Sequence, residues 1–171
     1  MTLQQLADLE AIKRLKYAYC RCVDTANIEE LKDLFTEDAS VRYEGGSYTF
    51  ETEGRDKILD GIRYAFHAEA IAQHHVNHPE IDFVSDTEAR GTWYLKDWFL
   101  DLNRKVITDG TAFYRDIYVK QDGRWKIKRA TYSRVYEIVT AFTDTPNITA
   151  HYLAKHGQKL PTENNATLQW K

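Results

Sequence analysis

Cysteine is scarce in this sequence, and long apolar runs are missing. The two cysteines, Cys20 and Cys22, lie close together in a helical pattern and can build neither a disulfide framework nor a four-ligand zinc site. No stretch of about 18 residues is apolar throughout, which excludes a transmembrane helix. The N-terminal segment mixes charges with apolar residues, unlike a signal peptide. We therefore expect a soluble cytoplasmic protein, in which the sequons at Asn147 and Asn165 are chance matches.

Basic residues are not in excess, because 23 Lys and Arg stand against 26 Asp and Glu, with a net charge of −3. A nucleic-acid partner would require a basic footprint that this balance does not provide. The sequence also has no phosphate loop, no Gly-rich dinucleotide fingerprint and no nucleophile elbow. We therefore expect no nucleic-acid partner, no membrane partner and no cofactor.

The residues that are abundant indicate an ordinary globular domain with many rings. A length of 171 residues suits one domain with a real core, and 43% hydrophobic and 29% charged residues are typical of globular proteins. Aromatic residues make up 13% of the chain. Such a share indicates a pocket or an interface lined with rings, although large cores use rings too.

The first third of the chain has mainly helical periodicity. Residues 3–24 predict an amphipathic helix, on which Lys16 reaches out past the apolar stripe. Asn27 predicts the N-cap of a second, short helix. Residues 39–51 predict a hairpin around a Gly-Gly turn, and residues 55–66 predict a third helix.

From about residue 71 the period changes to two. Strand patterns cover 71–84, 88–102, 105–120 and 124–139. Helices followed by a meander of long strands predict an α+β domain, and strands of this length usually bend. We expect a cone-shaped α+β barrel, in which a curved antiparallel sheet and the N-terminal helices enclose a pocket. Because the pattern fades near residue 140, we divide the chain into a domain of residues 1–140 and a tail, 141–171, that is loosely held or docks on a neighbouring subunit.

The segment AQHHVNHPEID carries three histidines, His74, His75 and His78. Two imidazoles four residues apart could share a metal ion on a helix, but strand patterns flank this segment and Pro79 would break a helix. On a strand, four residues span roughly 13 Å, too far for one zinc ion. We therefore expect no metal site. Each histidine taken alone is better explained as a surface or core residue than as a catalytic one.

Several other polar residues stand at positions where chemistry is conceivable. Asp24 ends the first helix, where a solvated carboxylate is the simpler explanation, and Tyr19 on the apolar stripe could simply pack. Asp97 shares one strand face with three large apolar residues, so its carboxylate must be paired, protonated or functional. Arg134 alternates with two tyrosines and could hold Asp97 or a substrate oxygen, or could be an exposed cross-strand charge.

Four segments of the chain together resemble the SnoaL-like family of the nuclear-transport-factor-2-like superfamily. These segments are AIKRLKYAYCRCVD, HHVNHPEID, ARGTWYLKD and AFYRDIYVKQDGRWKIKRATYSRVYE. They cover roughly residues 3 to 140. They are most similar to the branch that contains bile acid 7α-dehydratase, scytalone dehydratase and hexachlorocyclohexane dehydrochlorinase.

The resemblance implies a role for five residues. The catalytic histidine of the branch, five residues before the proline of its segment, corresponds to His74, and its partner carboxylate corresponds to Asp24. An acid or electrophile corresponds to Tyr19, the strand carboxylate to Asp97 and the arginine of the last strand to Arg134. The sequence departs from the pattern four residues after the histidine, where the branch often has asparagine and this chain has a histidine.

These residue types suit proton abstraction independently of the resemblance to the family. Histidine is a natural general base near neutral pH, and a carboxylate on its second nitrogen fixes the tautomer. We predict a cofactor-independent lyase of the dehydratase type, in which His74 removes a C–H proton from a hydrophobic polycyclic or aromatic small molecule. An isomerase or cyclase, similar to ketosteroid isomerase or the polyketide cyclases, would use the same proton chemistry. A different class is a non-catalytic ligand-binding protein, or one similar to the small subunits of aromatic-ring dioxygenases.

The second face of the long strands also carries rings, such as Tyr94 and Trp98. Large exposed aromatic patches usually mark an interface. Because the dehydratases of the resembling branch are trimers, we expect a homo-oligomer, a trimer built on this outer face.

Overall fold

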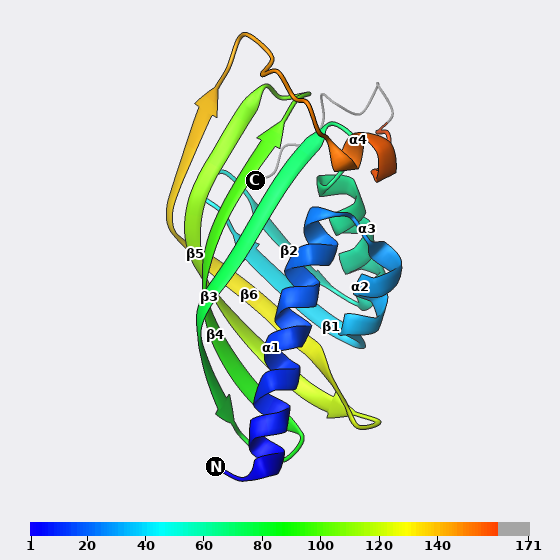
Figure 1. The fold of residues 1–171 in the computed structure, drawn as a ribbon, viewed down its shortest axis with the longest axis vertical. Helices are drawn as coiled ribbons and strands as arrows, with labels where there is room; N and C mark the ends of the chain where they lie inside the picture. The colour runs from blue at the N-terminus through cyan, green and yellow to red at the C-terminus, as the bar shows by residue number, and fades with distance from the viewer. Residues whose placement is uncertain (161–171) are drawn as a thin grey trace.

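A long helix, α1 (Leu3–Asp24), opens the chain, and a capping box fixes its first turn. The side chain of Thr2 accepts a hydrogen bond from the Gln5 N–H at 3.1 Å, and the side chain of Gln5 accepts one from the Thr2 N–H at 2.9 Å. The computed structural model describes residues 1–160 of the chain. Within it, α1 runs along the hollow of a curved sheet (Figure 1).

Two further helices follow the predicted signals. The short helix α2 (Ile28–Leu34) begins at the predicted cap, where the Asn27 side chain accepts from the Glu30 N–H at 3.2 Å. Helix α3 (Arg55–Ala65) follows Gly54, whose φ of 96° is a conformation that favours glycine. A fourth, short helix, α4, spans Tyr152–His156.

Six strands form one sheet: β1 (Phe35–Glu44), β2 (Thr49–Glu53), β3 (Ala70–Phe83), β4 (Glu88–Asp101), β5 (Val106–Gln121) and β6 (Arg124–Ala141). Their order is β2-β1-β6-β5-β4-β3. The pairing of β1 with β6 is parallel, and the other pairings between these six strands are antiparallel. The predicted α+β cone is confirmed, since the sheet curves around the helices (Figure 1). The parallel pair was not predicted, because alternation reveals a strand but not its neighbour.

A bulge bends β3 within the histidine segment. The register against β4 shifts between Asn77 and Glu80, and His78 adopts a φ of 50°. Histidine and asparagine are both enriched in this left-handed conformation, and Pro79, which has no N–H, is tolerated at a bulge. The left-handed backbone at the bulge therefore explains why histidine can stand at the position where the resembling branch often has asparagine.

Helix α1 docks on β5 through a buried ion pair. The sequence predicted that Lys16 reaches out past the apolar stripe, and this prediction is wrong, because its side chain is fully buried. Its Nζ lies 2.8 Å from Asp116 Oδ2 and 3.3 Å from the ring centroid of Tyr114. Burial raises the pKa of Asp116, while Lys16 and the hydrogen bond from the Tyr118 hydroxyl at 2.7 Å oppose the rise. The partner of Lys16 lies 100 residues away in the sequence, so the helical pattern alone could not reveal it.

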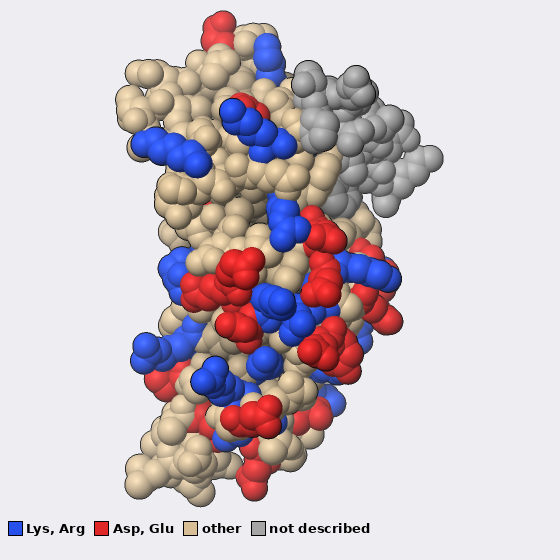
Figure 2. All heavy atoms as spheres, turned by 90° about the vertical axis from the view of Figure 1, so that its right-hand side faces the viewer, with Lys and Arg blue, Asp and Glu red and all other residues tan. Residues whose placement is uncertain are grey.

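The surface charges are mixed. Figure 2 shows Lys and Arg interspersed with Asp and Glu on the face that carries α2 and α3. No helix in the described part of the chain is long and apolar enough to cross a membrane.

The segment after β6 packs back on the same chain. Leu153 of α4 is 2% exposed, and His151 donates from Nε2 to the carbonyl of Ala70 at the start of β3, at 2.9 Å. Figure 1 shows α4 beside this end of the sheet, above α3. The division of the chain at residue 140 and the docking of the tail on a neighbouring subunit stay predictions. Residues 161–171 lie outside the described residues.

Candidate active site

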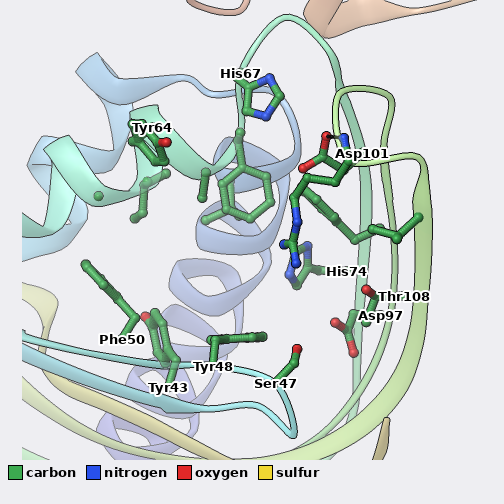
Figure 3. Close-up of a pocket in the computed structure, with 18 of the residues that line it drawn as sticks. Tyr43, Ser47, Tyr48, Phe50, Tyr64, His67, His74, Asp97, Asp101 and Thr108 are labelled. Atoms are coloured by element: carbon green, nitrogen blue, oxygen red, sulfur yellow. Dashed lines mark hydrogen bonds between the residues drawn. The ribbon is translucent and has the colours of Figure 1, made fainter. Parts of the chain in front are cut away.

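A cavity of about 420 Å³ lies between the concave face of the sheet and helices α1 and α3 (Figure 3). This volume is typical of sites that bind small molecules. One end of the cavity is aromatic, and its rings come from α1, β1, β5 and β6: Tyr19, Tyr43, Tyr114 and Tyr132.

Asp24 and His74 form a hydrogen-bonded pair at the wall of the cavity. Asp24 Oδ1 lies 2.5 Å from His74 Nδ1, and Asp24 Oδ2 accepts a hydrogen bond from the His74 backbone N–H at 2.9 Å. A carboxylate on Nδ1 selects the tautomer with a proton there and leaves the lone pair on Nε2. His74 is among the residues that line the cavity, and Asp24 is not. Asp24 therefore holds the imidazole from behind.

An apolar ring packs beside this imidazole, and a second ring packs on the first. The Phe66 ring centroid lies 5.7 Å from that of His74 and 5.8 Å from that of Phe99. The His74 side chain is only 12% exposed. The imidazole is thus shielded on one side by a ring and held on another by a carboxylate.

Asp97 stands next to His74 because the two residues are direct cross-strand partners on β3 and β4. Arg134 donates from both terminal nitrogens to the two oxygens of Asp97, with 2.9 Å between Nη2 and Oδ2, and its Nε donates to Glu137 at 3.0 Å. Burial lowers the pKa of Arg134, but the hydrogen bonds with Asp97 together with the electrostatic effects of Tyr48, Tyr132 and Asp97 outweigh it, and the pKa is raised overall. The sequence left open whether Arg134 holds Asp97 or a substrate oxygen. In the structure, its partner is the carboxylate of Asp97.

The tyrosines at the other side of the cavity share hydrogen bonds. The hydroxyls of Tyr19 and Tyr43 are 2.7 Å apart, and burial raises the pKa of Tyr19 above its usual 10.0, so this hydroxyl stays protonated. The Tyr43 ring stacks on Tyr132 with 4.8 Å between centroids, and the Tyr132 hydroxyl contacts that of Tyr48. Sequence reasoning missed Tyr43, although its alternation with buried Val41 on β1 was a usable signal.

Four of the five residues proposed from the sequence line the same cavity, and the fifth, Asp24, reaches it through His74. The four are Tyr19, His74, Asp97 and Arg134.

The neighbouring histidines lie elsewhere. His75 is exposed and is the cross-strand partner of Lys96 on the outer face, while His78 occupies the bulge. Within residues 1–160, no group of three or more His, Cys, Asp or Glu side chains could hold a metal ion.

Further polar residues line the cavity and were not singled out from the sequence, among them His67, Asp101 and Arg104. These three come from the connection between α3 and β3 and from the end and turn of the β4–β5 hairpin. Connections have no periodicity, so the sequence offered no signal for His67 and Arg104, whereas Asp101 continues the alternation that places Asp97 on the inner face of β4.

Comparisons with known proteins agree with this architecture. Residues 4–131 match the family model of the SnoaL-like domain. The structure of a proposed scytalone dehydratase from Novosphingobium aromaticivorans is 32% identical, covers 85% of this chain and 94% of its own, and superposes with a TM-score of 0.69.

Two other solved structures are similar in fold. A hexachlorocyclohexane dehydrochlorinase, LinA type 2, is 21% identical over 85% of this chain and 99% of its own, with a TM-score of 0.74. A proposed aromatic ring hydroxylase from Novosphingobium aromaticivorans is 22% identical over 79% of this chain and 94% of its own, with a TM-score of 0.71. The family match and the relative at 32% identity show that this chain belongs to the SnoaL-like family, as the resemblance of its segments indicated.

Proposed function

We propose that this protein is a cofactor-independent lyase that removes water from a hydrophobic polycyclic or aromatic small molecule. The observation that carries the proposal is the pair of Asp24 and His74, with 2.5 Å between Oδ1 and Nδ1 at the wall of a largely apolar cavity. In the described part of the chain, no side chain forms a hydrogen bond with His74 Nε2. A histidine held in this way is ready to accept a proton from a bound ligand.

The reaction begins at His74. Its Nε2 takes a proton from a carbon next to a carbonyl group of the substrate, and Asp24 stabilises the resulting imidazolium. The electron pair of the broken C–H bond forms a double bond as the hydroxyl group on the adjacent carbon leaves. That hydroxyl takes a proton from the paired hydroxyls of Tyr19 and Tyr43 and departs as water. The proton on His74 then returns to the tyrosine pair, so the enzyme ends the cycle unchanged.

Asp97 and Arg134 orient the substrate in this scheme. Asp97 is the cross-strand partner of His74, so its oxygens lie on the same side of the sheet as the base. Its bidentate contact with Arg134 fixes the carboxylate and balances its charge. A substrate hydroxyl that donates to Asp97 is thereby held beside His74.

The apolar wall and the relatives support this choice of reaction. Rings from four elements surround the cavity, which favours a flat hydrophobic ligand. A dehydratase and a dehydrochlorinase are both named for eliminations, and proteins with these names are among the similar structures. We also propose that the protein is a homotrimer assembled through the outer sheet face.

The test is an assay of the purified protein with bicyclic β-hydroxy ketones, followed by mass spectrometry of the products. We expect a product lighter by one water, and we expect His74→Gln to lower turnover by roughly 10²–10⁴-fold. His75→Gln is the matched control, because this neighbour is exposed on the opposite face of β3. Equal losses in the two variants would contradict the proposal, and a product of unchanged mass would favour the isomerase.

A further inference from the structure

The cavity has a second polar end that the proposed chemistry does not use. Figure 3 shows His67 and Asp101 at one end and Tyr43 and Tyr48 at the other, with His74 between them. Arg104 also lines the cavity and shares the β4–β5 hairpin with Asp101. A ligand that places its reacting carbon at His74 can therefore extend toward this end.

His67 is a buried, neutral hydrogen-bond donor at this end. Its Nδ1 accepts the Glu69 backbone N–H at 3.1 Å, so the proton of the neutral ring resides on Nε2. Burial lowers the pKa of His67 below its usual 6.5, although the carboxylates of Asp101 and Glu69 oppose this shift. The residue is 5% exposed, and no acceptor for its Nε2–H exists among residues 1–160. A ligand atom that accepts a hydrogen bond would satisfy it.

Arg104 supplies a positive charge that no other side chain of the described chain neutralises. Arg134, the other arginine of the lining, is paired with Asp97 and Glu137, whereas Arg104 forms no ion pair within residues 1–160. The nearby Asp101 is committed to the turn, since its Oδ1 accepts from the backbone N–H groups of Asn103 at 2.9 Å and Arg104 at 3.0 Å. These two bonds offset part of the negative charge of Asp101 and fix the turn that carries the guanidinium.

We propose that His67 and Arg104 form a subsite for a carboxylate at the end of the substrate remote from His74. The His67 Nε2–H and the guanidinium both donate to the carboxylate oxygens, in bonds strengthened by charge. This inference rests on the proposed function and narrows its substrate class to hydrophobic acids, with the ring system lying between the subsite and the base.

Direct binding tests the subsite without turnover. The probes are a naphthoate and the naphthamide of the same ring position, which share their shape and differ in charge. We expect the acid to bind about tenfold or more tightly than the amide in isothermal titration calorimetry at low salt, with a smaller preference at high salt. Equal affinities, or failure of both probes to bind at millimolar concentration, would overturn the proposal.

Substitutions of Arg104 and of its neighbour Lys105 separate the effect of the Arg104 charge from that of the overall positive charge of the turn. Arg104→Gln should abolish the preference for the acid. Lys105→Gln should leave it intact, because Lys105 is exposed on the same turn, as Arg104 is, but does not line the cavity. Equal effects of the two substitutions would overturn the role of Arg104.

For His67, two amide substitutions separate its structural role in the turn from its role in ligand binding. In His67→Asn the side-chain oxygen can still accept the Glu69 N–H, but no donor reaches the position of Nε2, whereas His67→Gln restores a donor there. We expect the Asn variant to bind the acid more weakly than the Gln variant, and equal affinities would reduce His67 to a turn residue. All titrations are repeated with His74→Gln. A preference for the acid without elimination activity would support the subsite and contradict the proposed function. Elimination activity without a preference for the acid would support the proposed function and contradict the subsite.

Discussion

Asp24 holds His74 through two contacts that have different consequences. The bond to the backbone N–H fixes the carboxylate in place, and the bond to Nδ1 sets which ring nitrogen carries the proton. Only the second contact matters for proton abstraction, because a base needs its lone pair on Nε2. The two contacts can therefore be separated by a substitution that keeps the shape and removes the charge.

Asp24→Asn is that substitution. The amide can still accept the backbone N–H, but it cannot stabilise an imidazolium and can select the wrong tautomer by donating to Nδ1. We expect turnover to fall about as far as in His74→Gln, and we expect the double variant to lose little more than either single variant, since the pair acts as a unit. Steady-state kinetics of the three variants measure this. Losses that multiply would mean that the two residues act independently.

At the scale of elements, α1 is fixed to the sheet by the ion pair between Lys16 and Asp116. Both side chains are fully buried, and the lysine cation also lies over the face of Tyr114. Removing one partner of a buried pair leaves a charge without compensation. The same helix carries Tyr19 and Asp24, so this pair also helps to position two residues of the proposed active site.

Lys16→Met should therefore destabilise the protein by about 3–5 kcal/mol, measured by urea denaturation. Lys13→Met is the control on the same helix, because its ion pair with Glu10 at 3.8 Å is at the surface and should contribute about 0–1 kcal/mol. A variant that also replaces Asp116 with Leu should recover part of the loss, because no charge is left unpaired. A similar small effect for Lys16→Met and Lys13→Met would show that the buried pair does not fix the helix.

Strand parity explains which parts of the fold and site were predictable. Period two fixed which face of β4 carries Asp97, and motif spacing singled out His74 from its neighbour His75. Alternation along a strand does not show which element packs beside it. The parallel pairing of β1 with β6 and the ion-pair partner of Lys16 could therefore not be predicted. His67 and Arg104 were missed because connections between elements have no period.

At the scale of the whole molecule, the outer face of the sheet carries exposed apolar side chains near the end of β6. Ile138 on β6 is 57% exposed and Tyr136 is 42% exposed, although both belong to a strand of the main sheet. Their cross-strand partners on β5 are Asp109 and Thr111, so this face mixes apolar and polar side chains. Exposed apolar side chains grouped on one face are typical of an interface. In the proposed trimer, a second copy of the chain covers them.

Light scattering at micromolar concentration should give three times the mass of one chain. Ile138→Lys places a charge in the proposed interface and should shift the mass toward that of the monomer, because an unpaired charge is costly to bury. Val84→Lys is the matched control, since Val84 is 53% exposed in the turn between β3 and β4, away from this end of β6. If the unmodified protein is a monomer, or if both variants dissociate it equally, the outer face near Ile138 is not the interface.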